Sequence, residues 1–122
     1  MKILANLMVA IVAALHFGFL ALEMVYWTKP LGLQVFHLTP ELATATQTLA
    51  ANQGLYNGFL AAGLVWSLFA RQNGFALKIF FLSCVVVAGG FGAWTANPEI
   101  LFVQAAPGAV ALALALISNR KA

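Results

Sequence analysis

The chain has 122 residues, of which 63% are hydrophobic and only 7% are charged, and its formal net charge is +3. The apolar residues come in runs near the length of a membrane span, which excludes a soluble globular protein and predicts a protein integral to the lipid bilayer. The basic residues are too few and too scattered for a nucleic-acid partner, and the single cysteine, Cys84, excludes an intramolecular disulfide.

Residues 3–27 form the first predicted span, and this apolar run is too long for the core of a cleaved signal peptide. The break at Lys29-Pro30 ends it, and an exposed connection follows. Thr39 is then a good N-cap, with proline at the first helical position, so helix is expected from there to residue 70. The early part of this helix is rich in threonine, and its spanning part is predicted at residues 51–70.

The second half of the chain contains two further predicted spans, residues 75–95 and 100–118. The tight turn before the third span is expected to place Gly74 in the left-handed region. In the fourth span, Pro107-Gly108 should loosen the helix next to Gln104 and free the carbonyl of Val103. Four spans nearly fill the chain, so residues 1–122 are predicted to form one domain.

The distribution of positive charge predicts the orientation in the membrane. Five of the six Lys and Arg fall at the amino terminus, around the second loop or at the carboxyl terminus: Lys2, Arg71, Lys78, Arg120 and Lys121. Only Lys29 lies in the first loop. By the positive-inside rule, we expect an up-down bundle of four transmembrane helices in the inner (cytoplasmic) membrane with both termini cytoplasmic.

Ionisable side chains inside the first span indicate a functional site, because such groups are costly in hydrocarbon. At a rise of about 1.5 Å per residue, His16, Asn57 and Gln104 come out at similar depth in the outer half of the bilayer. Glu23 comes out about 10 Å further out by the same rise, level with Asn52 and Gln53. The predicted ligand-binding residues are therefore His16, Glu23, Asn52, Gln53, Asn57 and Gln104.

Each of these residues also has a simpler explanation. Glu23 can reach lipid headgroups or pair with Lys29, and His16 can be a structural histidine bonded to Asn57 or Gln104. The amides can serve only to join helices, and the small residues Gly54, Gly58 and Ala62 can serve only in helix packing.

A metal site and a cofactor are not expected. His16 and Glu23 lie two helical turns apart on one helix, about 10 Å by helical rise, whereas metal-binding pairs on a helix use shorter spacing. A lone histidine can ligate haem iron, but no second signal supports haem.

Several segments together resemble a known family of small bacterial membrane proteins. They are ALHFGFLALEMVYW, which contains His16 and Glu23, the loop VFHLTPE, the block ANQGLYNGFLAAG, and QAAPG from Gln104. On these segments the chain resembles the family called domain of unknown function 1304 over nearly its whole length. The resemblance implies a four-span membrane protein. The family is functionally uncharacterised, so the resemblance assigns no site residue.

Three classes of function remain open. The leading hypothesis is binding or transport of a small polar or cationic molecule, with Glu23 at the entrance and His16 deep in an outward-facing pocket. A homo-oligomer is then expected, since one chain is small for a pathway. The first alternative is a membrane-embedded enzyme acting on a lipophilic substrate, with His16 as general acid or base and Asn57 or Gln104 polarising the substrate. The second alternative is a structural partner subunit, which needs no cavity.

Overall fold

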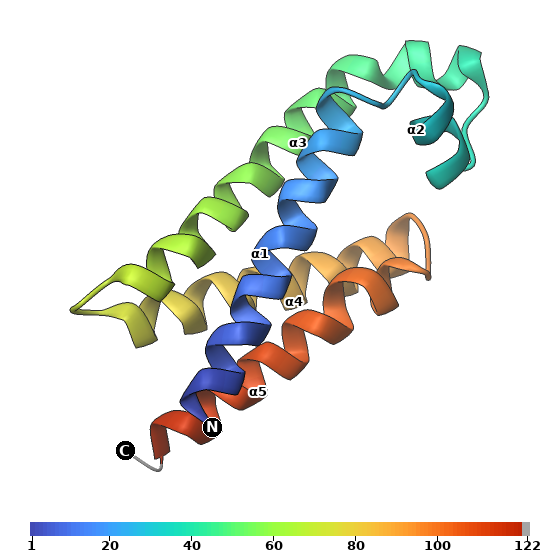
Figure 1. Ribbon diagram of the computed structural model, residues 1–122. Coiled ribbons are helices and arrows are strands. Elements are labelled where there is room, and N and C mark those ends of the chain that lie inside the picture. The colour runs from blue at the N-terminus through green and yellow to red at the C-terminus, as the bar shows by residue number, and fades with distance from the viewer. Residues whose placement is uncertain (121–122) are drawn as a thin grey trace. The chain divides into compact units, whose positions relative to one another are not determined.

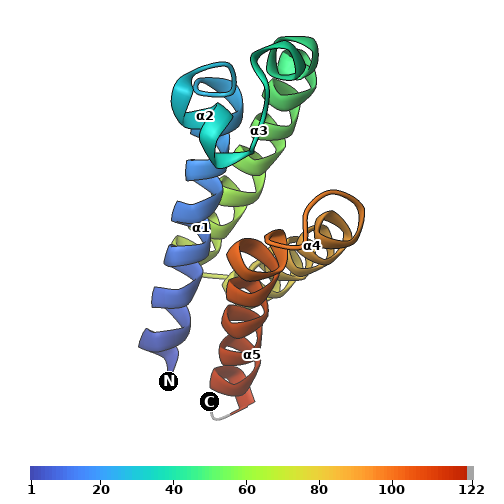
Figure 2. The ribbon, with the colours of Figure 1, turned by 90° about the vertical axis from the view of Figure 1, so that its right-hand side faces the viewer.

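The computed structural model describes residues 1–120, and this part of the chain is helical and contains no strand. Lys121, which entered the charge count, lies outside the described residues. Figures 1 and 2 show two views of the chain. The elements are, in order, α1 (Lys2–Met24), α2 (Pro30–Val35), α3 (Pro40–Phe69), α4 (Gly74–Thr95), the π-helical turn η1 (Leu101–Ala105) and α5 (Ala106–Arg120).

Three helical stretches are long and apolar enough to cross a membrane: Lys2–Met24, Gly74–Thr95 and Leu101–Arg120. Helix α3 is the longest element, with 30 residues, but threonines occupy its first half and Asn52, Gln53 and Asn57 its middle. The structure therefore agrees with an all-helical membrane protein, and three of the four predicted spans have the composition of a crossing helix.

The chain forms two compact units, and two helices contribute to both of them. Unit 1 contains Met1–Leu15 and Leu60–Ala122, and unit 2 contains His16–Phe59. Helix α1 runs from unit 1 into unit 2, and α3 returns from unit 2 to unit 1. The predicted site residues are therefore divided, with Gln104 in unit 1 and the other five in unit 2.

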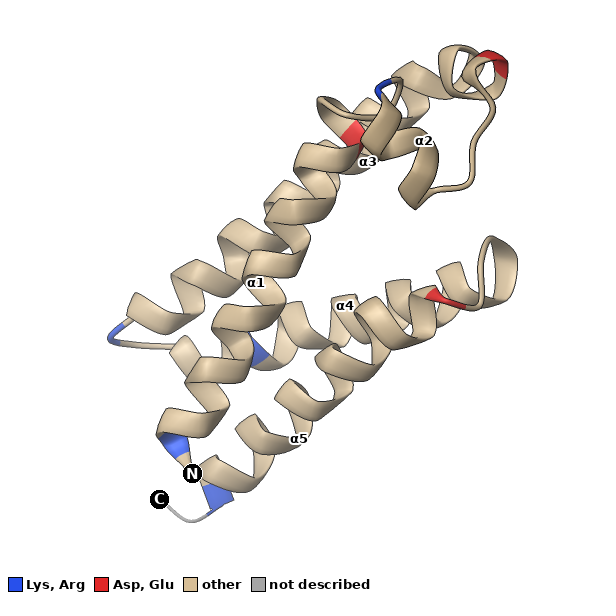
Figure 3. Cartoon of the chain, turned by 45° about the vertical axis from the view of Figure 1, so that its right-hand side comes forward, with Lys and Arg blue, Asp and Glu red and all other residues tan. Residues whose placement is uncertain are grey.

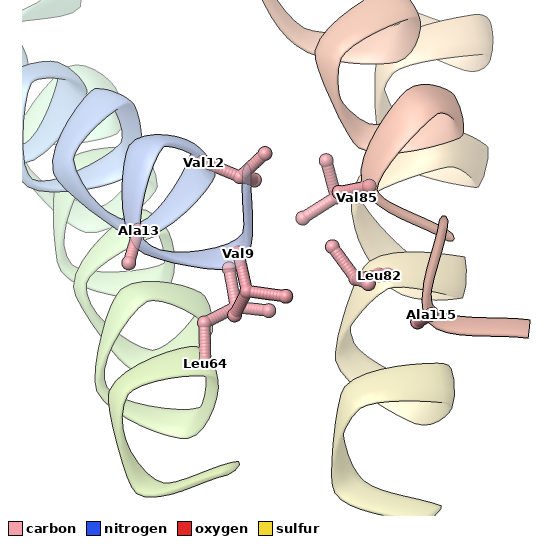
Figure 4. Packing of buried hydrophobic residues seen from close by; sticks show 8 residues of the cluster. Val9, Val12, Ala13, Leu64, Leu82, Val85 and Ala115 are labelled. Carbon is pink, nitrogen blue, oxygen red and sulfur yellow. The ribbon is translucent and has the colours of Figure 1, made fainter. Parts of the chain in front are cut away.

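The core of unit 1 collects small and branched apolar side chains from four helices (Figure 4). Its fully enclosed members are Val9, Val12 and Ala13 of α1, Leu64 of α3, Leu82 and Val85 of α4, and Ala111 and Ala115 of α5. Short side chains at these positions let the helices approach closely, which is how helices associate in hydrocarbon, where burial of apolar surface gives no advantage over lipid.

The start of α3 agrees with the N-cap predicted from the sequence. The hydroxyl of Thr39 accepts a hydrogen bond from the backbone N–H of Leu42 at 3.2 Å, and Pro40 is the first helical residue. This is the expected N-cap arrangement, because a threonine oxygen satisfies an amide that lacks an intrahelical partner.

The turn between α3 and α4 differs from the expectation. Asn73, with φ of 63°, is the residue in the left-handed region, and no glycine among residues 1–120 has positive φ. Gly74 is instead the first residue of α4. Asparagine adopts the left-handed conformation at lower cost than other residues with a Cβ, so the turn needs no glycine there.

The fourth predicted span begins with a π-helical turn just before Pro107. In η1 the backbone N–H of Ala106 donates to the carbonyl of Leu101, five residues earlier. Pro107 follows directly, and it has no N–H and a ring that crowds the preceding turn. The predicted loosening of this helix is confirmed, whereas the free carbonyl of Val103 stays a prediction.

Helix α4 lies against η1 through Gly89. A Cβ added at Gly89 would lie 2.7 Å from the backbone nitrogen of Ala105, whereas a Cβ at the adjacent Gly90 would meet nothing within 4 Å. We expect Gly89→Val to destabilise the protein by about 1–3 kcal/mol, because a backbone must move to accept the side chain. Gly90→Val is the matched control. Thermal unfolding in detergent measures both, and equal midpoints would show that α4 does not pack on η1.

Candidate functional site

The helices of unit 2 approach each other closely at glycines of α3. A Cβ added at Gly54 would lie 3.0 Å from the Cβ of Glu23 and 3.2 Å from the carbonyl oxygen of Leu20. A Cβ added at Gly58 would lie 2.5 Å from Cδ1 of Leu20. The predicted ridge of small residues is therefore a packing surface at these two positions, and its partner is α1.

This close packing brings two buried polar side chains together. The side-chain amide nitrogen of Asn57 on α3 donates a hydrogen bond to Oε1 of Glu23 on α1, at 2.7 Å. Glu23 is 9% exposed and Asn57 is 6% exposed. A carboxylate among apolar side chains is stable only when its oxygens find donors, so the amide of Asn57 both pairs and positions Glu23.

The contact between Asn57 and Glu23 is closer than the depth comparison indicated, since Glu23 was expected level with Asn52 and Gln53. Asn52 is exposed, and its side-chain amide donates to the backbone carbonyl of Thr48 in its own helix, at 3.1 Å. Gln53 lies with Glu23 on the wall of the hollow described below.

His16 and Gln104 complete the predicted set. His16 is fully buried, and its ring stands edge-on to that of Phe19, with 5.3 Å between the ring centroids. Gln104 is half-buried within η1 of unit 1. The structure thus brings Glu23, Asn57 and Gln53 together in unit 2, and a joint site with His16 and Gln104 stays a prediction.

A hollow of about 410 Å³ opens beside Glu23 within unit 2. Its lining is mostly apolar and comes from the end of α1, the turn that follows α1, the loop before α3 and the first half of α3. The lining residues are Glu23, Trp27, Leu38, Leu42, Thr46, Leu49, Ala50 and Gln53. The volume lies within the range of about 300–1,000 Å³ that small-molecule sites occupy.

Trp27 is fixed in the wall of this hollow by two contacts. Its indole Nε1–H donates to the hydroxyl oxygen of Thr46 at 3.1 Å, and its ring lies 4.8 Å from that of Phe36, centroid to centroid. The chain can turn back this tightly because Gly32 of α2 lies against the backbone of Tyr26, where any Cβ would overlap the Tyr26 carbonyl.

The sequence interpretation missed Trp27, Thr46 and the leucines around them as site residues. A signal was present, because Leu42, Thr46, Leu49, Ala50 and Gln53 recur at helical spacing and so share one face of α3. The sequence places the threonine-rich stretch outside the spanning part of its helix, and it places Trp27 near the outer interface on the same helical stripe as Glu23. Neither observation predicts that the two segments share a hollow.

The ligating side chains of the described residues do not gather into a metal site. Within residues 1–120, no three His, Cys, Asp or Glu side chains lie close enough together to hold a metal ion. The polar groups that line the hollow are one carboxylate, one amide, a hydroxyl and an indole on a mostly apolar wall, and the amide of Asn57 reaches it only through its hydrogen bond to Glu23.

The chain is similar to proteins of a recognised family along nearly its full length. The model of the family described as "Protein of unknown function (DUF1304)" matches residues 10–116. The Uncharacterized protein YpaA of Lactococcus lactis subsp. lactis (strain IL1403) is 30% identical over 121 residues, which cover 98% of each chain. No solved structure matches the chain. On this evidence the chain belongs to the DUF1304 family.

Proposed function

We propose that the protein crosses the inner membrane four times, with α3 from about residue 51 as the second span and both termini in the cytoplasm. The positions of the helix ends in unit 1 support spans that alternate in direction across the membrane. Lys2 at the start of α1, Lys78 near the start of α4 and Asn119 at the end of α5 line one hollow, so these ends lie together. Helix α3 ends at the short turn before α4 and so runs toward the same end.

The proposed orientation predicts the labelling of two loops. In a variant with Cys84 replaced by serine, a cysteine at Gln34 should react with an impermeant thiol reagent added from the periplasmic side. A cysteine at Asn73 should react only after the membrane is permeabilised, because the loop with the basic residues faces the cytoplasm. The reverse pattern would overturn the topology.

We infer that the hollow beside Glu23 binds a small organic cation. The carboxylate of Glu23 supports this inference, because it lies at the wall of a mostly apolar hollow and is held there by Asn57. In a low-dielectric site a fixed carboxylate attracts a cation much more strongly than it would in water. Apolar substituents on the cation would contact the leucines of the wall.

Trp27 supports a cation rather than another polar ligand. Indole is the aromatic ring that attracts cations most strongly when they lie within about 6 Å of its centroid, and Trp27 shares the hollow with Glu23. Aromatic rings around a carboxylate are suited to quaternary ammonium groups, which have no proton to donate in a hydrogen bond. An anion would meet the like charge of Glu23.

Fluorescence of Trp27 tests this function directly. Trp66 and Trp94 are exposed, so both can be replaced by phenylalanine to leave Trp27 as the only indole. Benzyltrimethylammonium should change the fluorescence of this variant saturably in detergent, and benzylsulfonate, which is similar in size but negative, should not. If both compounds act alike, or neither does, the hollow is not a cation site.

Because the protein lies in a membrane, we propose that it transports the bound cation. One chain offers little room for a pathway across a bilayer of about 30 Å, so we propose that transport takes place in a homo-oligomer. Proteoliposomes loaded with radiolabelled benzyltrimethylammonium should lose it faster with the parent protein than with a variant whose hollow is filled by Ala50→Phe. Equal rates of loss from the two kinds of proteoliposome would show that the protein does not transport the cation, even if it binds it.

A further inference from the structure

A second hollow, in unit 1, has the opposite charge character from the one beside Glu23. It has a volume of about 240 Å³ and lies between the start of α1, the start of α4 and the end of α5. It is lined by Lys2, Ala5, Asn6, Phe75, Lys78, Ala115, Ser118 and Asn119. Two lysines from different helices thus face one space together with two amides and a hydroxyl.

No acidic side chain of unit 1 is placed to neutralise these lysines. Glu99 is the only Asp or Glu in unit 1, and it follows the far end of α4, which spans about 33 Å from Gly74 to Thr95 at about 1.5 Å per residue. Figure 3 shows blue (basic) segments near the starts of α1 and α4 and a red (acidic) segment in the connection beyond the other end of α4. The two ammonium groups therefore lack a side-chain counterion within unit 1.

The start of α4 adds to the positive potential at this hollow. Asn73 makes no capping hydrogen bond with its side chain, and the first turn of α4 contains no acidic residue. Phe75 of that first turn and Lys78 just after it both line the hollow. The exposed amides at a helix start carry partial positive charge and favour anions.

We propose that this hollow binds a phosphate group with a net negative charge, with Lys2 and Lys78 as the charged ligands and Asn6 and Asn119 as hydrogen-bond donors. Basic pockets between membrane helices commonly accept lipid headgroups, and free phosphate offers the same chemistry. The site rests on unit 1 alone and is independent of the cation site.

Binding to the purified protein in detergent tests the proposal. A fluorescent phosphatidylglycerol with an intact headgroup is titrated with protein, with the matching phosphatidylcholine as the control lipid. Each lysine near an anionic group contributes about a fivefold gain in affinity, so Lys2→Gln with Lys78→Gln should weaken phosphatidylglycerol binding about thirtyfold. Arg71→Gln, an exposed residue outside the hollow, should leave it unchanged.

Two further measurements identify the ligand and separate a loss of charge from a loss of folding. The Lys2→Arg, Lys78→Arg protein keeps the charges and should keep the binding. Inorganic phosphate that displaces the lipid better than chloride at equal ionic strength assigns free phosphate as a ligand, whereas equal displacement assigns the lipid headgroup. The proposal is overturned if the double glutamine variant binds like Arg71→Gln, or if phosphatidylcholine binds as tightly as phosphatidylglycerol.

Discussion

Replacing Gly54 with leucine is expected to separate α1 from α3 in unit 2 and to lower the free energy of unfolding by about 1–3 kcal/mol. A side chain at this position meets the Cβ of Glu23 and the carbonyl oxygen of Leu20, and the backbone oxygen cannot move without the helix. Separation of the helices would also break the hydrogen bond between Glu23 and Asn57. Thermal unfolding in detergent and binding of benzyltrimethylammonium measure the two consequences.

Gly18→Leu is the matched control for this prediction. Gly18 also lies in unit 2, and a Cβ added there would meet nothing within 4 Å. The control should unfold close to the parent temperature and keep its ligand. Should Gly54→Leu behave like Gly18→Leu in both measurements, the two helices do not pack through Gly54.

Replacing Glu23 with glutamine is expected to weaken cation binding about a hundredfold. Two charges about 5 Å apart interact by about 3 kcal/mol at an effective dielectric constant of about 20, and about 1.4 kcal/mol corresponds to a factor of ten in affinity. Glutamine keeps an oxygen that accepts the hydrogen bond from Asn57, so the helix pair should stay intact. Titration of Trp27 fluorescence gives the dissociation constants.

Glu41→Gln separates the effect of the site from that of net charge. Glu41 is exposed at the start of α3 in the same unit and does not line the hollow, so its removal should leave the affinity within about twofold, as expected for a screened surface charge. An equal loss in the two variants would show that the cation responds to the charge of the whole surface.

The helices were predictable from the sequence because their ends carry strong signals. Thr39 with Pro40 marks the start of α3. The apolar run before Asn97 predicts the first and last residues of α4 almost correctly. Helix α2 was missed, since Pro30 and Gly32 within six residues are more typical of a turn. The choice between Asn73 and Gly74 for the left-handed position depends on where the next helix begins, which the sequence leaves open.

Glu23 and Asn57 could be singled out from the sequence as polar residues among apolar ones, but their pairing could not be predicted. Counting along each helix from its inner end assumes that the ends are level and that side chains extend sideways. The count puts Glu23 about 10 Å from the level of Asn57, so a shift between α1 and α3 and the reach of the two side chains must together bring them into contact. The packing of Leu20 and Glu23 on Gly54 and Gly58 sets that shift. This packing depends on the surfaces of both helices, so the pattern along either helix alone does not predict it.

The position of a bound cation tests the proposed cation site most directly. Tetraethylarsonium resembles a quaternary ammonium ion, and its arsenic can be located by anomalous scattering in a crystal of the protein. We expect one arsenic peak in the hollow of unit 2, beside the Glu23 carboxylate and within about 6 Å of the Trp27 ring centroid, with Asn57 still bonded to Glu23. An arsenic peak elsewhere with this hollow empty, or Glu23 turned to lipid away from Asn57, would contradict it.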